Sequence, residues 1–84
     1  MPAVTMYTTE WCGYCKRLKR AMEQHQISFD EVDIETHAEF GPMIETLTGG
    51  FRTVPTLEIC GEYLVNPSLN DVIKATEGCG AGAA

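Results

Sequence analysis

The chain has 84 residues, of which 44% are hydrophobic and 21% charged, values typical of a folded globular protein. This length accommodates one small domain, residues 1–84, and excludes a multidomain assembly; we expect a flexible tail from about residue 78 to 84. Twelve acidic against six basic residues give a formal charge of −6, the wrong sign for a nucleic-acid binder. Without a membrane-length apolar run or a signal-like start, we expect a cytoplasmic protein with no membrane partner, acting as a monomer.

The first half of the chain shows a strand, helix, strand pattern. Residues 4–8 form a β-prone run, residues 13–25 repeat apolar side chains at helical spacing, and residues 27–34 alternate as in a strand. Two strands around a helix predict a right-handed βαβ unit. A second helix is expected within residues 38–48, starting near Pro42 because proline is tolerated in a first turn, and ending at Gly49.

The second half predicts a hairpin and a last helix. Residues 56–59 and 62–65 are short strands around Cys60 and Gly61. A third helix follows, with Pro67 at an early position or Ser68 paired to Asp71 as a capping box. The order β-α-β-α-β-β-α predicts an α/β domain with a four-stranded mixed sheet flanked by three helices. With a Cys-x-x-Cys at the first strand-to-helix junction, it resembles the thioredoxin fold.

The pair Cys12 and Cys15 opens the first predicted helix, where free backbone N–H groups and the helix dipole favour an anion. We therefore expect a stabilised thiolate at Cys12, which attacks, and a less exposed Cys15, which can resolve. Lys16 and three further basic residues in 17–20 add a positive field, or are no more than a solvated helix face.

The segment Thr53, Val54 and Pro55 precedes the third strand, where a cis proline would leave the backbone of Val54 facing outward. Such a backbone can pair with an extended cysteinyl segment of a substrate, as in strand addition. Thr-Val-Pro alone is weak evidence, and its position about forty residues after the cysteine pair makes it specific.

Trp11 to Cys15, Thr53 to Pro55, and Asn66, Pro67 and Ser68 together resemble the mycoredoxins, the glutaredoxin-like proteins of mycothiol-using actinobacteria. The resemblance covers about residues 3–77. It implies a thiol-disulfide oxidoreductase of redox homeostasis that reduces mycothiol–protein mixed disulfides by a monothiol mechanism. Mycothiol would be the reductant and co-substrate, with no bound cofactor and no metal, and S-mycothiolated proteins the partners.

Carried over by residue, the resemblance makes Cys12 the nucleophile, Cys15 a dispensable second thiol and Pro55 the cis proline, with Tyr14, Thr53 and Val54 lining the ligand groove. Further candidates for ligand binding are Trp11, Lys16, Arg52, Asn66, Pro67 and Ser68.

The sequence departs from glutathione-dependent glutaredoxins in the charges expected around the ligand. Those proteins commonly carry a lysine where Thr9 stands, and a Gly-Gly, Asp-containing turn where Asn66, Pro67 and Ser68 stand. Because glutathione has two carboxylates and mycothiol is a largely neutral sugar conjugate, the missing charges favour mycothiol. Arg52 matches a basic residue common in glutaredoxins, so glutathione is not excluded as the ligand.

Several residues have a simpler interpretation beside the functional one. Trp11 is interpreted as an exposed rim that partner proteins touch, the alternative being core, and Tyr14 as either groove lining or helix packing. Cys60 is expected to be a small hydrophobic residue near the hairpin, with oxidation as a side role, and Cys79 an incidental thiol in the tail. His25 and His37 are interpreted as surface residues.

Two rival functions stay open. One is a thioredoxin-like dithiol donor, for example to ribonucleotide reductase, reduced by a flavoprotein reductase. The other is a cysteine-ligated zinc or iron–sulfur module, which is disfavoured because the other two cysteines do not form a second Cys-x-x-Cys.

Overall fold

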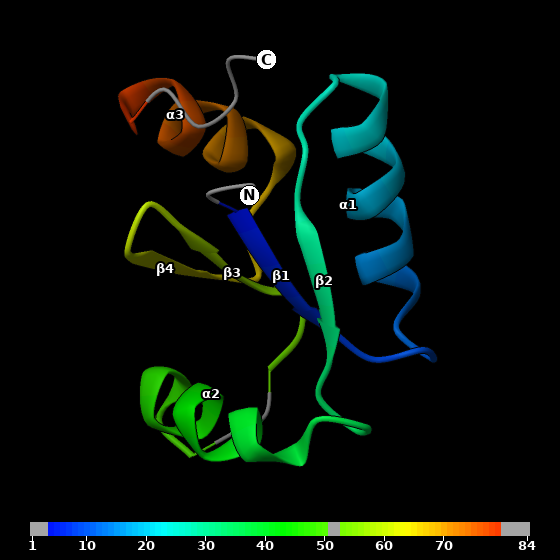
Figure 1. Cartoon of the computed structure of the whole chain (residues 1–84), viewed down its shortest axis with the longest axis vertical. Helices are drawn as coiled ribbons and strands as arrows, with labels where there is room; N and C mark the ends of the chain where they lie inside the picture. Colours follow the sequence, from blue (N-terminus) through cyan, green and yellow to red (C-terminus); the bar gives the residue numbers. More distant parts are fainter. Residues whose placement is uncertain (1–3, 51–52, 80–84) are drawn as a thin grey trace.

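The computed structural model describes residues 4–50 and 53–79. Its sheet has the strand order β2-β1-β3-β4, in which β1 is parallel to β2 and antiparallel to β3, and β3 and β4 form an antiparallel hairpin (Figure 1). The predicted four-stranded mixed sheet with three helices is confirmed. In chain order the elements are β1 (Val4–Thr8), α1 (Gly13–Gln24), β2 (Asp30–Asp33), the 3-10 turn η1 (Ala38–Phe40), α2 (Gly41–Thr48), β3 (Thr56–Ile59), β4 (Glu62–Val65) and α3 (Leu69–Cys79).

Helices cover both faces of the sheet. Successive β1 side chains point to opposite faces, so Met6 joins the larger core with residues of α1 and α3, and Tyr7 joins the smaller one with Ile44 of α2. Figure 1 shows α2 set apart from α1 and α3, which contact one another. This arrangement leaves the carboxyl end of β1, which leads into α1, between the two helical layers.

The strand β2 is shorter than predicted, because the end of α1 uses part of its sequence. Gln26 adopts a left-handed conformation with φ 59°, and the amide of Ile27 donates to the carbonyl of Met22 over 2.9 Å. This helix-ending motif consumes a backbone donor that a strand would need. Ile27 still packs in the core, but pairing with β1 starts only at Asp30.

The second helix begins as expected around Pro42. The turn η1 precedes it, Pro42 lies in the first turn of α2, and Gly49 ends it with φ 79°. A proline in that turn sacrifices no intrahelical bond, since the first amides have no partner there.

The boundary of the expected C-terminal tail is corrected. Helix α3 runs through Gly78 to Cys79, and residues 80–84 lie outside the described part of the chain. At its start the predicted capping box is confirmed: the amide of Ser68 donates to Asp71 Oδ2 over 3.1 Å, and the amide of Asp71 donates to Ser68 Oγ over 3.2 Å. Within the described residues, no helix is long and apolar enough to cross a membrane.

Candidate active site

Cys12 is the N-cap residue of α1. Its backbone is extended, and its Sγ accepts a hydrogen bond from the amide of Cys15 over 3.1 Å. The first amides of a helix have no partner within it, so a sulfur at this position takes the role that a serine or aspartate oxygen usually has. The predicted position of Cys12 at the free amides of the helix start is confirmed.

Cys15 lies one turn deeper, with 2% of its surface exposed against 7% for Cys12. Burial, followed by the hydrogen bond to Cys12, raises the pKa of the Cys15 thiol to about 12, outweighing an opposing hydrogen bond from the Thr9 backbone. Both cysteines are free thiols in this structure. The two sulfurs are therefore unequal: Cys15 is the more buried, and its burial favours the protonated thiol.

The proline loop lies against the cysteine pair. The Val54–Pro55 bond is cis, as predicted, and Cys12 Sγ donates to the carbonyl oxygen of Val54 at 3.9 Å. Thr56 Oγ1 donates to the carbonyl of Thr53 over 2.7 Å, and the amide of Asn66 donates to the carbonyl of Pro55 over 2.8 Å. These bonds hold the half-buried Thr53 and Val54 beside Cys12, and bring Asn66 to the same loop.

Two aromatic side chains next to the cysteine pair in sequence are exposed. Trp11 is 70% exposed, which agrees with its interpretation as a rim residue rather than core, and Tyr14 is 42% exposed. Arg17 lies over the Tyr14 ring, 5.8 Å from its centroid. A surface cavity of about 320 Å³ is lined by Trp11, Thr9, Ile34, Glu35 and Ala38. An indole this exposed beside the cysteine pair offers apolar area to a partner.

The basic residues of α1 have separate surroundings. Lys16 is exposed and lines a cavity of about 600 Å³ together with Cys15 and Thr9. Lys19 is paired with Glu31 of β2 over 3.1 Å, so its charge is largely compensated. Lys16 is thus the better-placed cation of the two for a ligand.

The structure says less about three other predicted site residues, Arg52, Pro67 and Ser68. Pro67 is buried, and the hydroxyl of Ser68 accepts the Asp71 amide at the start of α3. Arg52 lies outside the described residues. Their part in ligand binding stays a prediction.

Thr9 also belongs to the site, although the sequence indicated it only as the position where glutathione-dependent glutaredoxins commonly carry a lysine. Its carbonyl accepts the amide of Cys12 over 3.3 Å, and its buried Oγ1 has no hydrogen-bond partner among the described residues. Only the folding of the loop after β1 brings this hydroxyl beside Cys15, so the sequence carries no direct signal for it.

Of the predictions for the other two cysteines, the hairpin position of Cys60 and its oxidation are confirmed, whereas its hydrophobic packing and the tail position of Cys79 are wrong. Cys60 and Cys79 are joined in a disulfide, with 6.5 Å between their Cα atoms. Cys60 occupies the β3–β4 turn with φ 51° and is exposed rather than packed as a hydrophobic residue, and Cys79 ends a helix rather than lying in a tail. The pairing depends on α3 returning to the hairpin, which cysteine spacing does not reveal.

His25 and His37 are exposed, as predicted. Across residues 4–50 and 53–79, no three side chains of His, Cys, Asp or Glu gather where they would hold a metal ion.

A cysteine that caps a helix, a buried partner thiol and an adjoining cis proline on this α/β sheet define a thiol-disulfide oxidoreductase with a thioredoxin-like fold. Comparisons with known proteins agree. The family model for glutaredoxin matches residues 4–64, and the chain belongs to the glutaredoxin family.

Two curated relatives come from actinobacteria. The protein named "Putative glutaredoxin Rv3198A" of Mycobacterium tuberculosis is 48% identical over 71 residues, covering 83% of this chain and 84% of the relative. Mycoredoxin 1 of Corynebacterium glutamicum is 32% identical over 78 residues, covering 92% and 96%. Glutaredoxin-like protein NrdH of Lactococcus lactis subsp. lactis is 35% identical over 54 residues, covering 64% and 72%.

Solved structures show the same fold. Wheat glutaredoxin superposes with a TM-score of 0.67 at 25% identity, covering 90% of this chain and 72% of that one. The glutaredoxin of Archaeoglobus fulgidus superposes with a TM-score of 0.76 at 18% identity, covering 93% and 89%. The protein is thus a mycoredoxin-like glutaredoxin, an oxidoreductase with a thiol-based redox role.

Proposed function

We propose that the protein reduces mycothiol–protein mixed disulfides by a monothiol mechanism. The Cys12 thiolate attacks the mycothiol sulfur; the substrate's disulfide breaks, the protein thiolate leaves, and mycothiol becomes disulfide-bonded to Cys12. A second mycothiol thiolate attacks that mycothiol sulfur, releasing Cys12 as thiolate and forming mycothiol disulfide. The net reaction converts the mixed disulfide and one mycothiol thiol into a protein thiol and mycothiol disulfide, and no bound cofactor takes part.

The difference between the two thiols carries this proposal. Cys12 receives an amide hydrogen bond at a helix N-terminus, whereas burial raises the pKa of Cys15 to about 12. A thiolate is the attacking species and a stabilised thiolate is also the better leaving group. Cys12 therefore suits both steps, and Cys15 is a poor competitor for the mixed disulfide on Cys12.

The loop beside Cys12 supports a docking mode for the substrate. Val54 is half-buried and its carbonyl lies 3.9 Å from Cys12 Sγ. An extended cysteinyl segment aligned along the backbone of Val54 would bring its sulfur within reach of Cys12, with Tyr14 on the other side of the groove. Trp11, at the rim, is proposed to contact the protein part of the mixed disulfide.

Two observations favour mycothiol over glutathione. The position that commonly supplies a lysine to glutathione holds Thr9, whose side chain is neutral and buried. Hydroxyl and amide groups suit the largely neutral sugar of mycothiol, and the exposed Asn66 offers an amide beside the loop. The similarity to mycoredoxin 1 points the same way. We further propose that the reaction takes place in the cytoplasm, where small thiols are kept reduced.

The alternative is a dithiol electron donor, favoured by the similarity to glutaredoxin-like protein NrdH. In that mechanism the thiolate of Cys15 must displace the substrate from Cys12. Burial raises the pKa of the Cys15 thiol and so disfavours the thiolate that this step requires.

The test is a coupled assay on one S-mycothiolated and one S-glutathionylated form of the same substrate protein. We expect Cys12→Ser to abolish reduction and Cys15→Ser to retain it, with mycothiol the more effective reductant. A Cys60→Ser/Cys79→Ser variant is the matched control, because it removes two cysteines distant from Cys12. Equal loss in Cys12→Ser and Cys15→Ser, or turnover by a flavoprotein reductase without any small thiol, would support the dithiol alternative.

A further inference from the structure

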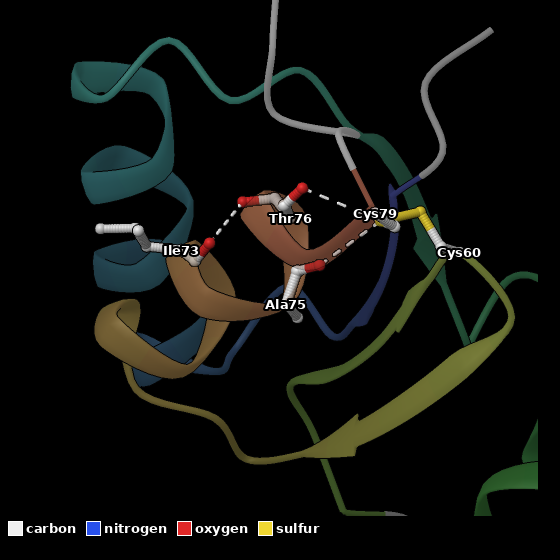
Figure 2. The surroundings of a disulfide bond; sticks show 5 residues. All are labelled: Cys60, Ile73, Ala75, Thr76 and Cys79. Atoms are coloured by element: carbon white, nitrogen blue, oxygen red, sulfur yellow. Dashed lines mark hydrogen bonds between the residues drawn. A yellow bond between two sulfur atoms is a disulfide. The ribbon is translucent and has the colours of Figure 1, made fainter.

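The Cys60–Cys79 disulfide lies outside the site described above. Cys60 begins the turn between β3 and β4, and Cys79 is the last residue of α3. Figure 2 shows the bond joining the end of the helix to the hairpin. The mechanism proposed for Cys12 uses neither sulfur, so the pair calls for its own explanation.

The pair is too far from Cys12 for exchange within one chain. Strand β3 starts beside the active site, where Thr56 pairs with Tyr7, and ends where Ile59 pairs with Val4. A strand of four residues spans about 13 Å, which separates Cys60 from the Val54 carbonyl that contacts Cys12. Any reduction of this disulfide must therefore come from another molecule.

The disulfide is open to such a molecule. Both cysteines are exposed, and both line a surface cavity of about 250 Å³ with Ile59, Glu62, Lys74 and Ala75. Structural disulfides are rare where small thiols are kept reduced, whereas exposed ones there are generally labile and regulatory.

We propose that Cys60 and Cys79 form a second thiol-disulfide site, which exchanges with low-molecular-weight thiols independently of Cys12. A thiolate attacks one sulfur of the pair, the Cys60–Cys79 bond breaks, and a mixed disulfide forms while the other cysteine leaves as thiolate. A second small thiolate completes the two-electron reduction, giving two protein thiols and one small-molecule disulfide. The reverse reaction uses that small disulfide as oxidant.

The surroundings assign the direction of attack. Cys79 Sγ lies 3.4 Å from the carbonyl oxygen of Ala75 and 3.9 Å from that of Thr76, both in the last turn of α3 (Figure 2). Unlike Cys12, which accepts an amide hydrogen bond at a helix N-terminus, Cys79 lies at the negative end of its helix dipole with two carbonyl oxygens near its sulfur, and this disfavours a thiolate there. Cys60 is therefore the leaving group, and the mixed disulfide forms on Cys79. After full reduction the Cys79 thiol can donate to the Ala75 carbonyl.

The experiment uses a Cys12→Ser/Cys15→Ser variant of the full chain, in which only this pair can react. The protein is equilibrated in buffers of glutathione and glutathione disulfide, quenched with acid, alkylated and mapped by mass spectrometry. We expect a disulfide in the most oxidising buffers, dithiol in the most reducing, full reversal between them, and a transient glutathione adduct on Cys79. A parallel series with mycothiol compares the two small thiols.

Matched controls add Cys60→Ser or Cys79→Ser to the same background. The first should hold a stable adduct on Cys79 and the second on Cys60, because no neighbouring thiol can displace it. Peptide mapping of the wild-type chain, with Cys12 blocked by iodoacetamide, repeats the measurement should the variant not fold.

Two results would overturn the proposal. One is alkylation of both cysteines in every buffer, which means that no disulfide forms. The other is a disulfide that millimolar thiol reduces only after denaturation, which makes it structural. An adduct found on Cys60 in the parent variant would overturn the assigned direction of attack.

Discussion

The protonation of Cys15 gives the most direct test of the site. In a Cys12→Ser variant that also carries Cys60→Ser and Cys79→Ser, Cys15 is the only thiol left, and serine is a good N-cap replacement for Cys12. Burial, the larger cause of its raised pKa, is retained in this variant, although the hydrogen bond to the Cys12 sulfur is lost. Its alkylation should be slow and should accelerate with pH far beyond the range of a free cysteine.

The pKa of about 12 holds with the Cys12 sulfur present, and its loss in this variant lowers that value, so the pKa of about 12 gives the upper limit of the effect. At pH 7.5 an ordinary thiol of pKa ~8.5 is roughly 9% thiolate, and Cys15 roughly 0.003%, a ratio of about 3000. The more basic thiolate is roughly 40 times more nucleophilic, so the net rate should be lower than that of a free thiol by a factor of up to about 80. Steric shielding can only lower it further.

Timed alkylation with iodoacetamide, read by intact mass, measures this rate against N-acetylcysteine. We expect the logarithm of the Cys15 rate to keep rising by about one per pH unit beyond the pH at which the free thiol levels off. A slow rate that levels off near pH 9 would show shielding without a raised pKa, and a rate within threefold of N-acetylcysteine at neutral pH would refute both.

Three further predictions concern stability and recognition. Replacing Cys60 and Cys79 by serine removes a cross-link between residues 19 apart in sequence. The free energy of unfolding should fall by ~3 kcal/mol, which lowers Tm by roughly 12–24 °C in calorimetry. An unchanged Tm would contradict a formed disulfide in the wild type. Asp71→Asn should lower Tm at pH 7 but not at pH 2. Hydrogen bonds from Ser68 lower the pKa of the Asp71 carboxyl, so the ionised carboxylate stabilises the fold above the ordinary carboxyl range. This stabilisation is lost as pH falls through the lowered pKa of Asp71. A gap that persists at pH 2 would assign the effect to packing instead. Trp11→Ala should raise KM roughly tenfold for protein mixed disulfides and leave a small mixed disulfide unaffected in the same coupled assay; equal effects on both substrates would place Trp11 in the small-thiol groove.

The amino-acid sequence by itself determined the strand and helix order and the place of the reactive pair. These features rest on local physics: apolar spacing, Pro42 in a first turn, and a cysteine at a helix start whose free amides face it. Even the capping box of Ser68 and Asp71 depends only on residues three apart.

Tertiary structure decided what depends on contacts between distant segments. The raised pKa of Cys15 comes chiefly from burial, which exists only once the sheet and helices have packed around it. The Cys60–Cys79 bond needs α3 to return to the hairpin, and a turn and a helix end far apart in sequence carry no local sign of that meeting. Local patterns fix backbone conformation within a few residues, whereas burial and disulfide pairing depend on where those segments come to lie in the folded chain.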